Sequence, residues 1–212
     1  MKLMLELFSG TGRMAQAFRD KGWIAKTIDN YYPADLQADI LGLTRGDIVS
    51  LMNGEPDFIH ASPPCQAFST ASMGKHWGGG FRAYKPMTKT AKMGVALAEK
   101  TKEIIGWFPN VKFCIENPRG VLRKLPVFQG FKRHTITFCQ YGEKRMKPTD
   151  LWCNLEKWMP RPMCKNGDAC HDRAPRGSKT GTQGLKGAYD RAALPFEFCR
   201  EVAFWVDDEV KG

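Results

Sequence analysis

Residues 3–12 read LMLELFSGTG, a short apolar run with one glutamate that breaks at a glycine loop. Beyond the loop, apolar side chains recur at helical spacing over residues 14–18. A second apolar run, residues 23–28, ends at Asp29. Strand, glycine loop, helix and strand in this order predict a parallel sheet that binds ligands at the carboxyl ends of its strands.

Two acidic residues follow this opening. Asp29 ends the second predicted strand, where a carboxylate can accept hydrogen bonds from ribose hydroxyls. The alternative is an ordinary turn residue before Asn30, because aspartate and asparagine favour turns. Asp39 precedes Ile40 and Leu41 and is expected to cap the next short element.

A cysteine follows the third predicted strand, residues 58–61. Pro63 and Pro64 stop the strand and stiffen the turn, so the side chain of Cys65 can be held in one direction. A thiol at a rigid turn is a candidate nucleophile. The alternative is that Cys65, one of seven cysteines, is a small buried apolar residue.

Residues 66–98 contain no aspartate or glutamate, and Gly78, Gly79 and Gly80 lie in their middle. The basic residues of this stretch are Lys75, Arg82, Lys85, Lys89 and Lys92. A glycine-hinged basic loop after a nucleophile predicts a lid, residues 69–92, that closes over a phosphate backbone. A plain surface loop is the alternative.

A helix is predicted over residues 90–107, and the face marked by Met93, Leu97, Ile104 and Phe108 is expected to pack on the sheet. A strand over 111–115 follows and ends at Glu116. The carboxyl ends of adjacent parallel strands converge, so Cys65 and Glu116 are expected to face one pocket. The alternative places Glu116 against the end of a neighbouring helix.

Strands over residues 135–139 and 149–153 are predicted to form an antiparallel hairpin with a basic tip that contains Lys144, Arg145 and Lys147. Residues 154–187 have little periodicity. A last helix is predicted from Pro195, with an apolar face that closes the sheet.

The formal net charge is +10, and the isoelectric point is near 9.3. These values favour a polyanionic partner over a basic surface that is merely solvated, and nucleic acid is the commonest such partner. The sequence has no long apolar run and no amphipathic basic helix, which argues against a membrane. Glu6 interrupts the first apolar run too early for a signal peptide, so we expect a cytoplasmic protein with reduced thiols.

The order of these motifs resembles the DNA cytosine carbon-5 methyltransferase family, especially its short phage-type members. The resemblance rests on residues 7–12 (LFSGTG), 63–66 (PPCQ), 116–118 (ENP) and the basic hairpin 141–147. It implies an α/β fold, the Rossmann-like fold of S-adenosylmethionine-dependent methyltransferases: a mostly parallel, doubly wound sheet with an antiparallel hairpin. It also implies the cytoplasm of a bacterial or phage-infected host cell.

The resemblance divides the chain into three parts. Residues 1–150 are the expected catalytic core, 151–188 a small basic insert in place of a larger target-recognition domain, and 189–212 a helix that completes the core. Because the insert is short, target selectivity is either low or supplied by a protein partner.

Within this family, Cys65 would attack carbon 6 of a flipped cytosine as a thiolate, and Glu116 would bind ring nitrogen 3 and the exocyclic amine. Arg145 and Lys147 resemble the Arg-x-Arg pair that holds the base and the nucleophile in register. The residues implied to bind S-adenosylmethionine are Phe8, Ser9, Gly10, Thr11, Gly12, Asp29, Asp39, Ile40 and Pro63.

Two departures from the family pattern are visible. Glu143 and Lys144 stand where the family has Pro-Gln, so the register of Arg145 and Lys147 is open by about two residues. Ala192 replaces the asparagine of the last motif, which here reads RAALP over residues 191–195.

Four soft or borderline ligands lie in or beside the insert: Cys153, Cys164, Cys170 and His171. They could hold structural zinc in a segment without a core of its own. The spacing lacks a Cys-x-x-Cys pair, and unrelated cysteines are the alternative.

The resulting hypothesis is an enzyme that methylates carbon 5 of cytosine in DNA. Two alternatives stay open: a cytosine methyltransferase that acts on RNA, and a nucleic-acid or cofactor binder without turnover.

Overall fold

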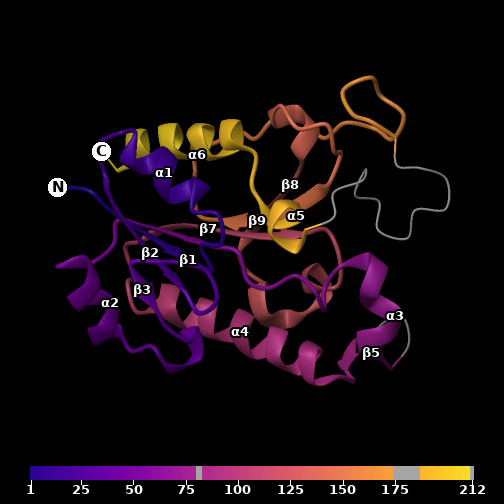
Figure 1. Ribbon diagram of the computed structural model, residues 1–212, viewed down its shortest axis with the longest axis horizontal. Coiled ribbons are helices and arrows are strands. Elements are labelled where there is room, and N and C mark those ends of the chain that lie inside the picture. Colours follow the sequence, from indigo (N-terminus) through magenta and orange to yellow (C-terminus); the bar gives the residue numbers. More distant parts are fainter. Residues whose placement is uncertain (80–82, 174–186, 211–212) are drawn as a thin grey trace.

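A computed structural model describes residues 1–79, 83–173 and 187–210. Its centre is a seven-stranded sheet in the order β3-β2-β1-β4-β7-β9-β8 (Figure 1). The strands are β1 (Leu3–Leu7), β2 (Ile24–Asp29), β3 (Leu36–Gln37), β4 (Phe58–Ala61), β7 (Lys112–Pro118), β8 (Lys132–Thr137) and β9 (Pro148–Cys153). All run parallel except β9, which pairs antiparallel with both β7 and β8. The predicted fold class is therefore confirmed.

Helices cover both faces of this sheet. In Figure 1, α1 (Arg13–Arg19) and α6 (Phe196–Glu209) lie above it, and α2 (Arg45–Met52) and α4 (Lys89–Gly106) lie below. The short helices are α3 (Met73–His76) and α5 (Ala188–Ala192), and the 3-10 turns are η1 (Ile40–Gly42), η2 (Thr70–Ser72), η3 (Leu122–Lys124), η4 (Pro126–Phe128) and η5 (Phe138–Tyr141). A separate two-stranded ribbon joins β5 (Trp77–Gly78) to β6 (Lys85–Pro86).

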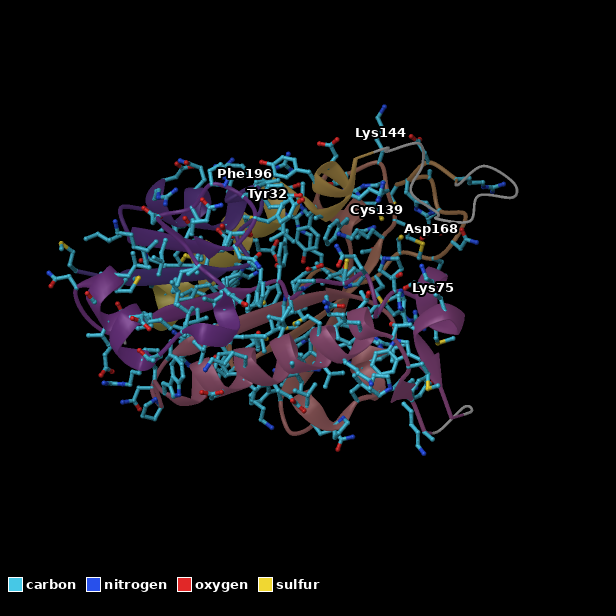
Figure 2. All side chains as sticks on the ribbon, turned by 60° about the horizontal axis from the view of Figure 1, so that its bottom comes forward. Tyr32, Lys75, Cys139, Lys144, Asp168 and Phe196 are labelled. Atoms are coloured by element: carbon cyan, nitrogen blue, oxygen red, sulfur yellow. The ribbon has the colours of Figure 1, made fainter. Side chains whose placement is uncertain are left out.

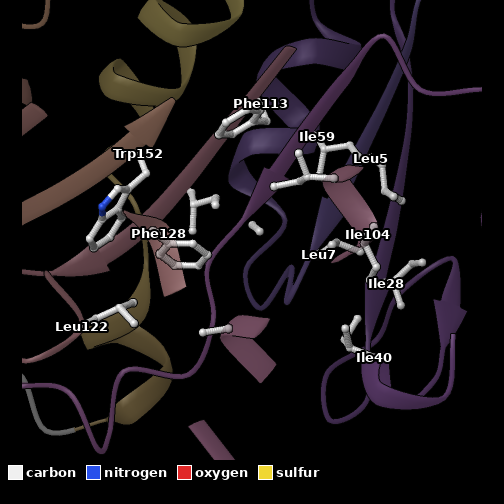
Figure 3. Packing of buried hydrophobic residues seen from close by; sticks show 14 of the residues in the cluster. Leu5, Leu7, Ile28, Ile40, Ile59, Ile104, Phe113, Leu122, Phe128 and Trp152 are labelled. Carbon is white, nitrogen blue, oxygen red and sulfur yellow. The ribbon is translucent and has the colours of Figure 1, made fainter. Parts of the chain in front are cut away.

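The sheet separates two apolar clusters. One lies under α4 and includes Leu5, Ile59, Ile104 and Phe128 (Figure 3). The other lies under α1 and α6, where Phe18 stacks on Phe58. Because both faces are covered, the central parallel strands are apolar almost throughout, which is why β1 and β4 were visible as short apolar runs.

Local signals explain where several elements begin. The side chain of Asp39 accepts a hydrogen bond from the amide of Leu41 and caps η1, which confirms that expectation. Thr44 and Asp47 form a reciprocal capping box at the start of α2, a helix that sequence periodicity did not predict.

Two boundaries and one packed face differ from the prediction. Residue 139 was expected in the first hairpin strand, but β8 ends at Thr137 and Cys139 lies in η5. Residue 150, where the catalytic core was expected to end, lies inside β9, which continues to Cys153. In α4, Met93 was expected in the packed face but is exposed, and the buried positions are mainly small residues such as Ala91, Gly94 and Ala98.

Two ionisable side chains meet inside the sheet. Glu6 of β1 is opposite His60 of β4, with 3.7 Å between Glu6 Oε1 and His60 Nδ1. Burial raises the pKa of Glu6 from 4.5 to about 8 and lowers the pKa of His60 from 6.5 to about 3. Glu6 Oε2 also accepts a hydrogen bond from the amide of Ala15 in α1.

Glu6→Gln is expected to stabilise the protein in alkaline solution. The folded state holds the Glu6 proton between pH 4.5 and about 8 while the unfolded state releases it, so wild-type stability falls as pH rises through that window. Within that window, the Glu6 carboxyl lowers the free energy of unfolding by up to about 1.4 kcal/mol per pH unit. Urea unfolding at pH 5.5 and 8.5 measures it, with exposed Glu99→Gln as the control; equal pH dependence in wild type and Glu6→Gln contradicts the assignment.

Candidate active site

The turn after β4 carries Cys65 at the carboxyl edge of the sheet. The amides of Phe68 and Ser69 both donate hydrogen bonds to the Cys65 carbonyl, at 3.0 and 3.1 Å. Asn117, at the end of β7, donates from its side chain to the Pro63 carbonyl at 2.8 Å. These bonds and the two prolines fix the backbone, and the Cys65 side chain stays half-buried.

Glu116 lies near the carboxyl end of β7, one residue beyond Ile115, which pairs with Ala61 of the neighbouring strand β4. Its side chain is buried, and among the described residues Glu116 Oε1 has no hydrogen-bond partner. Burial raises the pKa of the Glu116 carboxyl, and the Lys147 ammonium opposes that shift. A buried carboxyl with a free acceptor and a raised pKa is suited to bind a ligand that offers both a donor and an acceptor.

The electrostatic environment links Cys65 to both expected partners. Burial, and after it the Glu116 carboxylate, raise the pKa of the Cys65 thiol, while the cations of Lys147 and Arg191 lower it. The charges of Glu116 and Lys147 therefore both act on the Cys65 thiol, as expected for side chains that face one pocket. In this state the thiol is held largely protonated, so attack by the thiolate requires that its proton be removed or its charge stabilised.

The two hairpin residues have different surroundings. Lys147 has a positive φ of 28°, its ammonium lies 4.3 Å from the centre of the Phe138 ring, and it donates to the Arg191 carbonyl. Arg145 is buried, and its guanidinium binds the Glu143 carboxylate and the same carbonyl. Lys147 is thus the hairpin cation that acts on Cys65, and Arg145 holds the turn.

Two residues at the site were not predicted from the sequence. Asn117 joins the end of β7 to the cysteine turn, and Arg191 adds positive charge near Cys65. Both residues belong to the motifs at 116–118 and 191–195 that were compared with the family pattern. Their position in these motifs is the sequence signal that could have identified them as site residues.

Lys147→Met is expected to raise the pKa of Cys65 further, because it removes the larger of the two side-chain cations that lower it. The rate of Cys65 alkylation by iodoacetamide, followed by mass spectrometry of its peptide, should shift to higher pH. Lys144→Met, an exposed cation of the same hairpin, is the control and should leave the profile unchanged. Identical pH dependence of Cys65 alkylation in wild type and Lys147→Met would show that Lys147 does not act on the thiol.

The glycine loop after β1 is strained. Phe8, Gly10 and Gly12 have positive φ angles of 56°, 48° and 65°. Such angles are costly for a bulky residue, and they concentrate at ligand sites. The hydroxyl of Ser9 is buried and has no partner among the described residues, which fits a loop that receives a polar ligand such as S-adenosylmethionine.

The other residues expected at the cofactor have structural contacts. Asp29 accepts hydrogen bonds from the amides of Gly10, Tyr31 and Tyr32, so its carboxylate already joins the glycine loop to the turn after β2. Ile40 is buried in the core, and Asp39 caps η1. Part of the Asp29 acceptor capacity remains for a ribose hydroxyl.

The segment expected to form a lid is partly packed onto the cysteine turn. Trp77 stacks on Phe68, with ring centres 5.9 Å apart, and its indole N–H donates to the Ala67 carbonyl. His76 lies 2.7 Å from the hydroxyl of Thr88. Gly80 and Arg82, also expected in this lid, lie outside the described residues.

Three of the four expected metal ligands come together. Cys164, Cys170 and His171 cluster with Cys139 rather than with Cys153. Cys153 is buried in β9, opposite Cys114, in the cluster under α6. Residues 174–186 of the expected insert lie outside the described part of the chain. Among the residues that the structure describes, no helix is long and apolar enough to cross a membrane.

Comparison with known proteins identifies similar methyltransferases. A family model described as C-5 cytosine-specific DNA methylase matches residues 3–90. A Frog virus 3 (isolate Goorha) protein with the name "Probable DNA (cytosine-5)-methyltransferase" is 28% identical over 170 residues, which are 79% of this chain and 77% of that protein.

Two solved structures share the fold. A DNA modification methyltransferase encoded within a prophage (E. coli) matches with a TM-score of 0.51 and 15% identity over 72% of this chain and 46% of that one. The Entamoeba histolytica methyltransferase EhMeth matches with a TM-score of 0.53 and 15% identity over 78% of this chain and 57% of that one. The chain thus spans about half the length of these structures. The chain is similar to the C-5 cytosine-specific DNA methylases, and this similarity confirms the family resemblance drawn from its motifs.

Proposed function

We propose that this chain transfers a methyl group from S-adenosylmethionine to carbon 5 of cytosine in DNA through a covalent adduct with Cys65. The observation that carries the proposal is the juxtaposition of a thiol, a buried carboxyl and a cation, from Cys65, Glu116 and Lys147, at the carboxyl edge of the sheet. The similarity to cytosine-specific DNA methylases supports the same chemistry.

Cytosine carbon 5 is a weak nucleophile, and addition at carbon 6 overcomes this. The Cys65 thiolate forms a bond to carbon 6, and the electron pair displaced from the ring double bond makes carbon 5 nucleophilic. Carbon 5 then takes the methyl group from the sulfonium, which S-adenosylmethionine supplies. Loss of the carbon 5 proton to a base restores the double bond and expels Cys65 as the thiolate.

The role proposed for Glu116 follows from its raised pKa. A protonated carboxyl can donate to ring nitrogen 3, and its other oxygen can accept from the exocyclic amine. Thymine has a hydrogen on nitrogen 3 and a carbonyl in place of the amine, so it mismatches both contacts. Glu116 would therefore select cytosine and also withdraw electron density from the ring as Cys65 adds.

Positive charge next to the site suits a nucleic-acid substrate. A stacked base is inaccessible to Cys65, so the target cytosine must leave the helix. Lys75, Lys85, Lys89 and Lys92 lie on the segment that follows the cysteine turn, where we place contacts with DNA phosphates.

The test uses isotopically labelled S-adenosylmethionine with duplex DNA, single-stranded DNA and RNA in parallel. Label in DNA supports the proposal, and label in RNA alone overturns its substrate. A duplex that contains 5-fluorocytosine should trap an adduct, because fluorine cannot leave as a proton, and peptide mass spectrometry should place it on Cys65. Bound S-adenosylmethionine without transfer to any substrate would indicate a binder that lacks turnover.

A further inference from the structure

Two distant parts of the chain bring three thiols and an imidazole together. Cys139 lies in η5, at the end of β8, and Cys164, Cys170 and His171 lie in the segment after β9. One ligand atom from each lies within 4.8 Å of all the others. Figure 2 labels Cys139 and the nearby Asp168 in this region, where yellow sulfur atoms are visible.

A tight turn brings two of the cysteines together. The Lys165 amide donates to the Asp168 carboxylate at 2.7 Å, and the Asp168 amide donates to the Lys165 carbonyl at 3.1 Å. Gly167 has a φ of 99°, which glycine adopts without strain. Because the chain reverses here, Cys164 and Cys170 both lie beside Cys139, although five residues separate them in the sequence.

Three of the six separations between ligand atoms fit a tetrahedral ion. Zinc bonds of about 2.3 Å to sulfur and about 2.05 Å to nitrogen give tetrahedral edges of about 3.8 Å between sulfurs and about 3.6 Å from sulfur to nitrogen. Cys170 and Cys139 are 3.7 Å apart, and His171 Nδ1 is 3.6 Å from Cys164 Sγ and 3.5 Å from Cys170 Sγ.

A fourth separation differs from the ideal. Cys139 Sγ and Cys164 Sγ are 3.1 Å apart, shorter than a zinc edge and longer than the bond of about 2.05 Å in a disulfide. A bound ion would move these two sulfurs apart by about 0.7 Å, which small side-chain rotations can supply.

Burial in this segment is confined to candidate ligands. Of residues 162–173, only Cys164 and His171 are buried, and this stretch contains no helix or strand. A peptide with so little apolar burial does not offset its loss of conformational entropy. Thiolate and imidazole ligands are those that zinc selects, and a structural zinc ion stabilises such segments directly.

We propose that Cys139, Cys164, Cys170 and His171 bind a structural zinc ion that fixes the segment after β9 to the end of the hairpin. The amide of Asp172, next to His171, donates to the Lys144 carbonyl at 2.8 Å. The zinc centre is thereby joined to the turn that carries Arg145 and Lys147.

The test measures metal in the full-length protein, purified under reducing conditions from zinc-supplemented medium. We expect about one zinc per chain by elemental analysis. Cobalt(II) in its place should give the intense visible absorption of a tetrahedral thiolate site. The variant Cys170→Ser removes the exposed ligand and leaves the buried side chains in place; it should weaken zinc binding by at least about a hundredfold in a chelator competition.

The control variant is Cys153→Ala, which removes a buried cysteine outside the cluster and should keep the full zinc content. Circular dichroism of both variants confirms that the sheet is folded. Absence of zinc in the reduced wild-type protein, unchanged affinity in Cys170→Ser, or a Cys139–Cys164 disulfide in place of the metal would overturn the proposal. The readout is metal content, so it is independent of whether the protein methylates DNA.

Discussion

Cys65→Ala is expected to reduce methyl transfer to DNA by roughly four orders of magnitude or more, because it removes the only group proposed to form a bond to carbon 6. Without that bond, carbon 5 stays too weak a nucleophile to take the methyl group. Steady-state incorporation of labelled methyl into duplex DNA measures the loss. The 5-fluorocytosine adduct should disappear in the same variant.

Stability separates a chemical effect from a structural one in this variant. Cys65 is half-buried, and its backbone carbonyl rather than its sulfur accepts the bonds that hold the turn. The free energy of unfolding of Cys65→Ala should therefore be within about 1 kcal/mol of the wild-type value. Turnover within tenfold of wild type would exclude covalent catalysis by Cys65, whereas a large loss of stability would make the activity result uninformative about chemistry.

The sheet could be predicted because its signals are local. β1 and β4 are short apolar runs bounded by a glycine loop and by prolines, and both were predicted with their observed bounds. Cys65 and Glu116 follow directly from the ends of such runs, since parallel neighbours place their carboxyl ends together.

The packed face of α4 was harder to predict because large apolar residues do not mark it. Gly94 lies against Phe68, and a Cβ at this position would approach the ring to 3.1 Å. Ala91 and Ala98 continue this close-packed stripe, while Met93 is exposed. A helix that approaches the core closely needs small residues, and hydrophobic periodicity gives them little weight.

The cysteine cluster is a tertiary feature. Cys139 and Cys164 are 25 residues apart and come together only because η5 turns Cys139 out of the strand direction. Cys153, although closer in sequence, lies in β9 and packs in the core. The arrangement of strands and turns decides which cysteines become neighbours, and the spacing of cysteines in the sequence does not indicate that arrangement.

Gly120→Ala is expected to destabilise the protein by about 3 kcal/mol or more and to disrupt the cysteine turn. A Cβ at Gly120 would lie 2.0 Å from the Phe68 carbonyl oxygen and 3.4 Å from the Ser69 Cα, and backbone cannot rotate away as a side chain can. Gly120 bridges Ser69, and the Val121 amide donates to the Phe68 carbonyl at 2.8 Å, so these contacts must break or shift.

The displacement reaches the nucleophile through the backbone. Phe68 and Ser69 both donate to the Cys65 carbonyl, so moving them moves Cys65 relative to Glu116. A shift of about 1 Å at a reacting group can cost about a hundredfold in rate, so activity should fall even in the fraction of Gly120→Ala that stays folded. Urea unfolding and methyl transfer by the folded protein measure the two effects separately.

Gly106→Ala is the matched control for this prediction. Gly106 ends α4, and a Cβ there meets no atom within 4 Å, so this substitution should leave stability unchanged or raise it slightly. Equal stability and equal activity in Gly120→Ala and Gly106→Ala would disprove the close approach of the loop after β7 to the cysteine turn. A loss of activity at unchanged stability would instead mean that the turn is soft and that Gly120 acts by aligning Cys65 with Glu116.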